Sequence, residues 1–138
     1  MITINYWAVF LAALAPMVIG MFWYSPVLFG QLWMKMVGIT DKKAQEIKEK
    51  GMGFTYLYMF LACMTTAYVM ANLLALMGIK TIGMGVMAGF WMWLGFVAPV
   101  SLSGYLFAAE KKPVGLYFLE NGFQLVSFMV QAAVLAYF

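Results

Sequence analysis

Polar side chains are rare inside the apolar stretches of this sequence, and several of them gather near its C-terminal end. Glu120 is the one acidic residue within a long apolar run. Three further polar residues follow it along that run: Gln124, Ser127 and Gln131. Because successive residues of an α-helix are rotated by about 100°, these four side chains would share about 60° of arc on one helix face. Such a stripe can carry a small ligand or a proton, or it can hydrogen-bond to a neighbouring helix.

Glu120 is the member of this stripe whose chemistry favours a function over packing. An ionised carboxylate is costly in hydrocarbon, and buried acids in membrane proteins usually have a use. Amides and hydroxyls serve equally well as hydrogen bonds between helices, worth about 0.6 kcal/mol each. By depth along the helices, Tyr24 and Ser103 should lie near the level of Glu120, and we predict that they stabilise it with Asn121. The candidate ligand or proton site comprises Glu120, Gln124, Asn121, Tyr24, Ser103 and Gln131.

The residue types that serve catalysis and metal binding are scarce. The 138 residues include one cysteine, Cys63, and no histidine. An intrachain disulfide, most zinc and haem sites and a Ser-His-Asp triad are therefore excluded. Met17 and Met21 have the spacing of thioether ligands for copper(I), but methionine also replaces leucine in lipid, and the 14 methionines are scattered. We expect no enzymatic activity, no cofactor and no metal.

The elements that must position these residues are membrane-spanning helices. The sequence is 66% hydrophobic and 9% charged, whereas soluble domains are about 25% charged. A helix needs roughly 20 apolar residues to cross a bilayer. Four runs are long enough, and we predict them as transmembrane helices of one all-α domain covering residues 1–138: residues 5–24, 54–77, 82–109 and 114–138.

The segment between the first two predicted spans, residues 25–53, carries a shorter amphipathic stretch. Ser25 followed by Pro26 predicts an N-cap and a first helical position, and residues 27–37 then present a broad apolar face. About a dozen residues are too few to cross, so we predict a short interfacial helix. The alternative is a loop that packs on the helix bundle. Thr40 predicts the cap of a second, polar helix.

Lysines indicate how the chain is oriented in the membrane. The net charge is +3, and all eight basic residues are lysines. Seven lie in residues 25–53 and 110–113, and only Lys80 lies in the turn between the second and third spans. Because cytoplasmic loops are rich in lysine, we predict a multi-pass protein of the bacterial inner membrane with both termini outside and residues 25–53 in the cytoplasm. Short lysine loops do not form a nucleic-acid surface, so the expected partner is the lipid bilayer and no nucleic acid.

Small residues recur on the predicted third span. Gly85 and Gly89 are four residues apart, and Gly95, Pro99 and Ser103 continue in steps of four. Small residues at such steps let two helices approach closely. The stripe can pack inside one bundle or form the seam of a homo-oligomer such as a dimer, and a homo-oligomer is the protein partner that we expect.

Two stretches resemble a known family. The first is GMFWYSPVLFGQLW at residues 20–33, with the pattern WYSPxxFGxxW. The second comprises WLGFVA at residues 93–98 and LFAAEKKPVGLYFLENGFQL at residues 106–125. The chain resembles a family of small bacterial four-helix membrane proteins of unknown function, with a lysine in its AAEKKP turn where that family has an arginine. The resemblance implies fold and topology, and no activity.

Two function classes remain open. The first is an integral membrane protein that binds or transports a small ligand or a proton along the polar stripe of the fourth span. Small multidrug exporters also have four helices and an embedded glutamate, although theirs lies in the first helix. The second class is a structural or accessory subunit whose surface packs against another membrane protein or against itself.

Overall fold

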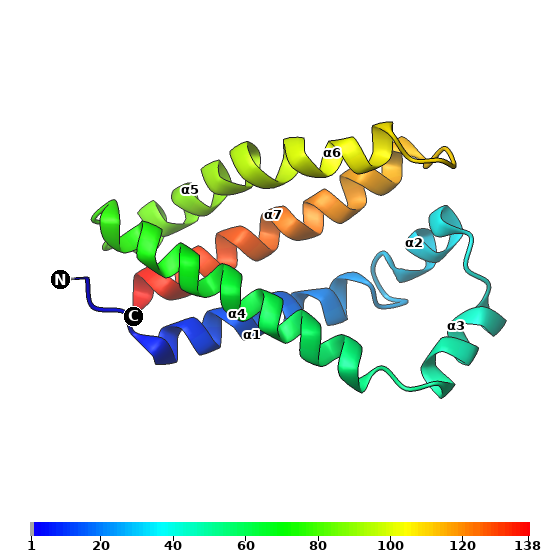
Figure 1. The fold of residues 1–138 in the computed structure, drawn as a ribbon, viewed down its shortest axis with the longest axis horizontal. Coiled ribbons are helices and arrows are strands. Elements are labelled where there is room, and N and C mark those ends of the chain that lie inside the picture. The colour runs from blue at the N-terminus through cyan, green and yellow to red at the C-terminus, as the bar shows by residue number, and fades with distance from the viewer. Residues whose placement is uncertain (1) are drawn as a thin grey trace.

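The computed structural model describes residues 2–138, and the regular secondary structure of this part of the chain is entirely helical (Figure 1). Four of its helical runs are long and apolar enough to cross a membrane, and shorter helices connect them. The predicted all-α fold with four such helices is confirmed. The elements are α1 (Tyr6–Trp23), α2 (Gly30–Val37), α3 (Asp41–Glu49), α4 (Gly53–Leu76), α5 (Ile82–Met92), η1 (Trp93–Val97), α6 (Ala98–Leu106) and α7 (Val114–Tyr137).

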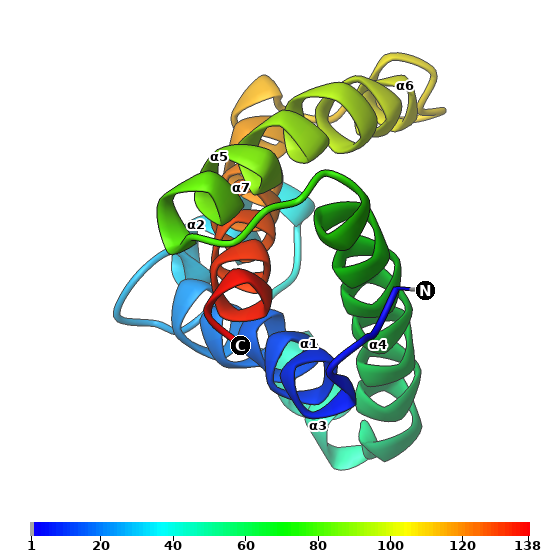
Figure 2. The same ribbon diagram turned by 90° about the vertical axis from the view of Figure 1, so that its left-hand side faces the viewer.

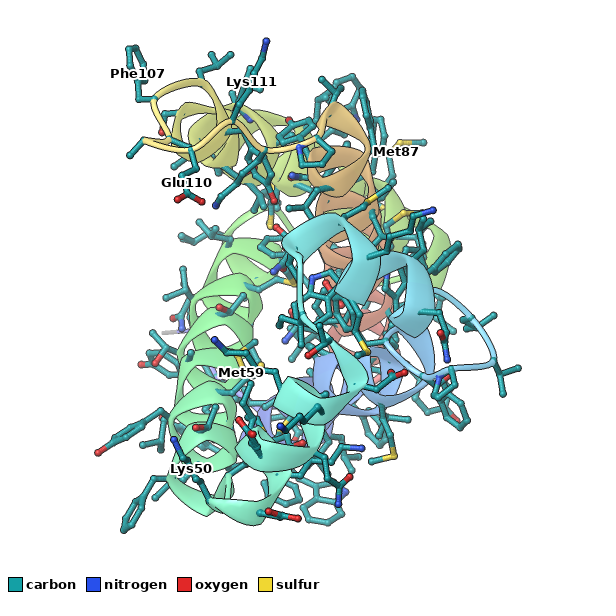
Figure 3. All side chains as sticks on the ribbon, turned by 90° about the vertical axis from the view of Figure 1, so that its right-hand side faces the viewer. Lys50, Met59, Met87, Phe107, Glu110 and Lys111 are labelled. Atoms are coloured by element: carbon teal, nitrogen blue, oxygen red, sulfur yellow. The ribbon has the colours of Figure 1, made fainter. Side chains whose placement is uncertain are left out.

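The long helices run antiparallel, so that the loops fall at two opposite ends of the molecule. Both termini and the turn between α4 and α5 lie at one end, while α2, α3 and the turn between α6 and α7 lie at the other (Figure 1). Figure 3 looks at the second end and labels Lys50, Glu110 and Lys111 there. The two lysine-rich loops therefore share one end of the bundle.

Helix α7 is the centre of the bundle. It packs against α5 on one side and against α1 on the other, and α4 packs mainly on α1 (Figure 2). Small side chains let α1 and α4 come together, because Ala12, Ala13 and Ala67 are fully buried beside Val9 and Cys63. This arrangement leaves α7 in contact with every other long helix, so the polar stripe on it is positioned by the whole bundle.

Glycines bring α5 against α7. A Cβ atom added to Gly85 would lie 2.7 Å from the carbonyl oxygen of Ala132, and one added to Gly89 would lie 2.6 Å from that of Phe128. Real Cβ atoms do not approach backbone so closely, so both positions require glycine. This half of the small-residue stripe packs inside the chain, whereas a Cβ at Gly95 would meet nothing within 4 Å.

The third span contains a wide turn of π-helix, η1, directly before Pro99. Proline has no backbone N–H, and in a regular α-helix its ring would meet the carbonyl group of Gly95. A π turn is a common way to absorb such a clash. The helix then continues as α6 and ends at Leu106, three residues before the predicted end.

The connection between α1 and α2 differs from the prediction. Helix α2 begins at Gly30, and Ser25 does not cap it, because the Ser25 hydroxyl donates to the carbonyl oxygen of Phe22 at 2.6 Å and closes α1 instead. The N–H of Gly30 donates to the Ser25 carbonyl oxygen at 2.9 Å. A Cβ at Gly30 would lie 2.7 Å from that oxygen and closer still to the carbonyl oxygen of Tyr24. The WYSP and FG parts of the pattern thus form the two sides of one tight turn.

The Thr40 cap at the start of the charged segment agrees with the prediction. Gly38 ends α2 in the left-handed conformation with φ 76°, and the Thr40 hydroxyl accepts a hydrogen bond from the N–H of Lys43 at the start of α3. Helix α3 has no buried residue. In Figure 1 it lies beyond the end of α4 rather than along a long helix.

Candidate functional site

Glu120 lies in α7 where two other helices approach it. Its Oε1 atom accepts a hydrogen bond from the indole Nε1–H of Trp33 in α2 at 3.3 Å. Its Oε2 atom accepts a hydrogen bond from the hydroxyl of Tyr105 in α6. The carboxylate therefore joins α2, α6 and α7 through donors that carry no charge.

Aromatic rings surround this carboxylate. The ring of Tyr24, at the end of α1, packs edge-on against Trp33 with 5.6 Å between centroids and against Phe123 with 5.4 Å. The Nζ atom of Lys112 lies 5.2 Å from the centroid of the Tyr105 ring. Tyr24 is thus beside the residues that bind Glu120, as the prediction placed it, although the hydrogen bonds come from two other side chains.

Ser103, the second predicted stabiliser of Glu120, faces away from it. Its hydroxyl donates to the carbonyl oxygen of Val100 in its own helix at 2.9 Å, and the residue is exposed. Tyr105 stands two residues later and therefore about 200° further round the helix, which turns it toward α7. An estimate of depth finds the part of α6 that lies near Glu120. It does not show which side of α6 faces α7, and therefore does not distinguish Ser103 from Tyr105.

Asn121 belongs to a separate network that ties α7 to α6. Its Oδ1 atom accepts a hydrogen bond from the Ser101 hydroxyl at 3.0 Å, and its Nδ2 atom donates to the carbonyl oxygen of Tyr117 at 3.0 Å. The Tyr117 hydroxyl in turn donates to the carbonyl oxygen of Ala98 at 2.7 Å. The oxygen of the buried Asn121 amide thus links α7 to α6, while its nitrogen bonds within α7.

The far part of the stripe is buried without partners. Ser127 and Gln131 are each 1% exposed, and within residues 2–138 neither the Ser127 Oγ atom nor the Gln131 Nε2 atom has a hydrogen-bond partner. Gln124 is half-buried between them and Glu120. The six predicted site residues therefore fall into four groups. Glu120 and Tyr24 belong to one cluster, Asn121 to a structural network, Ser103 is exposed, and Gln124 and Gln131 lie further along α7.

Sequence reasoning missed Trp33 and Tyr105, the two donors to Glu120. Trp33 closes the WYSPxxFGxxW pattern, and an indole within a short amphipathic helix is a usable signal, since such a ring needs a partner for its N–H. Nothing in the sequence alone indicated that α2 folds back onto α7. The described residues contain no group of three or more His, Cys, Asp or Glu side chains that could hold a metal ion.

The comparisons with known proteins identify a family and no activity. A family model described as "Protein of unknown function (DUF1761)" matches residues 7–136. No curated protein and no solved structure matches the chain. The match covers almost the whole chain, as the resemblance predicted, and any function must be argued from the geometry.

Proposed function

We propose that this chain, which belongs to the family described as "Protein of unknown function (DUF1761)", is a membrane protein that binds a proton or a small cationic ligand at Glu120. The observation that carries the proposal is the pair of neutral donors on its carboxylate, Trp33 and Tyr105. Neutral donors stabilise the negative charge without cancelling it. A half-buried carboxylate held in this way can still take up a proton or a cation, whereas one paired with a lysine would already be neutralised.

The aromatic surroundings favour an organic cation as the small ligand. The faces of Trp and Tyr rings attract ammonium and guanidinium groups. Lys112 already lies over the Tyr105 ring, so one face of this cluster accepts a cation in the chain itself. Tyr24 and Trp33 offer further rings at the same level.

The binding step has a mechanical consequence for α2. Trp33 connects α2 to α7 through Glu120, and α7 is the main helix that α2 contacts. Protonation of the carboxylate removes the charge that strengthens this hydrogen bond. Uptake of a proton would therefore weaken the contact of α2 with α7, and loss of the proton would restore it.

The polar stripe supplies a route between Glu120 and the opposite end of the bundle. Ser127 and Gln131 have buried polar atoms without partners in the described chain, and such atoms readily bind water or a passing polar ligand. We propose that a transported proton or ligand moves past Gln124, Ser127 and Gln131 along α7. The lysine distribution supports the associated orientation, with both termini outside and residues 25–53 in the cytoplasm.

Infrared spectroscopy tests proton binding directly. Purified protein in nanodiscs, moved between about pH 4 and pH 9, should give a carboxyl difference band that Glu120→Gln lacks. Glu110→Gln, which removes an exposed acid in the turn between α6 and α7, should keep the band. Tetraethylammonium, used as the cation probe, should bind to the wild type and to Glu110→Gln but not to Glu120→Gln. Identical spectra and identical tetraethylammonium binding in all three proteins would refute the proposal.

The orientation has its own test. A cysteine placed at Gln45, in α3, should be protected in intact cells from an impermeant maleimide and become reactive after the cells are opened. The variant should also carry Cys63→Ala, so that only one thiol is present. Ready labelling of intact cells would contradict the proposed orientation.

A second candidate function, as an accessory or self-associating subunit, rests on the remaining small residues. Gly95, Pro99 and Ser103 are exposed and follow one another in steps of four on η1 and α6, a pattern that suits close approach of another helix. Gly95→Leu should then lower the mass of the complex measured by light scattering, while Gly83→Leu, on an open position of α5, should not. Unchanged mass in both variants would remove this candidate.

A further inference from the structure

A cavity of about 370 Å³ lies beside α3, and Trp33, a residue that donates to Glu120, is one of its lining residues. Its walls come from the end of α1, from α2, from α3 and from the start of α4. The volume falls within the range of small-molecule sites, roughly 300–1,000 Å³. It sits at the end of the bundle that carries most of the lysines, the end that faces the viewer in Figure 3. Glu120 is not among its lining residues.

Helix α3 turns one particular face to this cavity. Its residues Ala44, Ile47 and Lys48 line the cavity, and their spacing of three and four places them on one side of the helix. Ala44 and Ile47 are the only apolar residues of α3. An otherwise polar helix thus turns both of its apolar side chains toward the cavity. An apolar group bound there would remove the surface of these side chains from water, which is favourable.

The charges around the cavity select for an anion. Lys48 lines it, while the acids of α3, which are Asp41, Glu46 and Glu49, do not. The remaining lining is mostly apolar and includes Met34, Ile39 and Met52. Residues 25–53 together contain five lysines and three acids, so the surroundings are also positive. A ligand that fits has a negative head and a hydrocarbon chain.

We propose that the cavity binds an anionic membrane phospholipid, with its phosphate at Lys48 and part of an acyl chain between α2 and α3. The bilayer supplies this ligand at the level where the long helices end. The bound lipid would fill the gap between α3 and the bundle and fix α3 against the membrane surface. Trp33 and Tyr24 line this cavity as well as the surroundings of Glu120. The inference rests on Lys48 and on the apolar face of α3, so it does not require that Glu120 bind a proton or a cation.

Native mass spectrometry of delipidated protein tests this with two lipids that have identical chains, phosphatidylglycerol and phosphatidylcholine. The wild type should bind phosphatidylglycerol more tightly, and Lys48→Gln should weaken that binding by about tenfold or more, the effect of one charge-assisted contact. Lys43→Gln makes the same charge change on the same helix at a position outside the cavity, and it should leave the binding unchanged. Equal losses in the two variants, or equal binding of the two lipids by the wild type, would overturn the proposal.

A cavity-filling variant separates the site from the general positive surface. Ala44→Trp keeps Lys48 but occupies the space of the chain, so it should lose the tightly bound lipid, with circular dichroism confirming that the helices are retained. Full binding by this variant would overturn the proposal. Inorganic phosphate and dodecanoate, tested separately, identify the source of the ligand. Displacement of the lipid by phosphate alone, or binding of dodecanoate as tight as that of phosphatidylglycerol, would show that a phospholipid is not the ligand.

Discussion

The contact of α5 with α7 and the contact of α2 with α7 are built in different ways. Helix α5 meets α7 backbone to backbone at Gly85 and Gly89, with no room for a single extra carbon. Helix α2 meets α7 through a side-chain hydrogen bond from Trp33 to Glu120 and through the Met36 side chain beside Gly115, next to a cavity. Close-packed contacts have one low-energy arrangement, whereas a contact that includes a single long-range hydrogen bond can be made and released. We therefore expect α5 to stay fixed against α7, and α2 to be the helix that can separate from α7.

Replacing a glycine of the fixed contact should have the largest effect. In Gly89→Leu, the new side chain would start 2.6 Å from the carbonyl oxygen of Phe128, so α5 must move away from α7. We expect a loss of about 3 kcal/mol in the free energy of unfolding, at the upper end of overpacking costs, measured by denaturant titration in mixed micelles.

Gly83→Ala is the control for that experiment, because a Cβ at Gly83 would meet nothing within 4 Å. Alanine should leave stability equal or raise it by up to about 1 kcal/mol, since glycine is unfavourable in a helix. If the two substitutions had the same effect, the contact of α5 with α7 would not be the fixed region described above.

Gly30→Ala should have the next largest effect, and a local one. The added Cβ would collide with two carbonyl oxygens of the turn that connects α1 to α2, at a cost of about 2 kcal/mol. Helix α2 should detach while the long helices remain, so limited proteolysis should cut within residues 25–40 without loss of helical circular dichroism. Gly53→Ala, at an open position, should remain resistant, and cleavage of both variants alike would contradict this view of the turn.

The sequence predicted those features of the fold that depend on local chemistry. The lengths of the apolar runs determine the long helices, and the cap at Thr40 follows from residue type. Ser25 was misplaced because a serine after a helix has two local partners, and its hydroxyl bonds backward to Phe22. Which partner the Ser25 hydroxyl binds depends on the conformation of the whole turn, in which the Gly30 N–H donates to the Ser25 carbonyl oxygen.

The candidate site was predictable only along α7. Helical periodicity alone places Glu120 and Gln131 on one stripe. The donors to Glu120 come from elements whose rotation and docking depend on contacts across 87 and 15 residues of chain, from Trp33 and Tyr105. Such long-range choices are decided by packing of the complete bundle, which is why depth estimates selected Ser103 instead.

Removing the Trp33 donor from the contact of α2 with α7 should lower stability less than Gly89→Leu or Gly30→Ala. Trp33→Phe keeps the ring but loses the hydrogen bond to Glu120, at a cost of about 1 kcal/mol. In a double-mutant cycle with Glu120→Leu, which removes both acceptor oxygens, the two losses should not add, because both act on one interaction. Additive losses would mean that the Trp33–Glu120 hydrogen bond contributes nothing, and α2 would then be held by apolar packing alone.

The smallest effects should separate a bonded serine from an unpaired one. Ser101 donates to Asn121 at 3.0 Å and links α6 to α7, so Ser101→Ala should cost about 0.6 kcal/mol, the usual value for such a bond in a membrane protein. Ser127 is more deeply buried than Ser101 but has no partner for its Oγ atom in the described chain, so Ser127→Ala should leave stability unchanged or slightly raised. Unfolding titrations of the two variants side by side measure the difference. A cost at Ser127 as large as that at Ser101 would mean that its hydroxyl binds a water molecule that stabilises the fold, and the stripe beyond Gln124 would then be part of the fixed region.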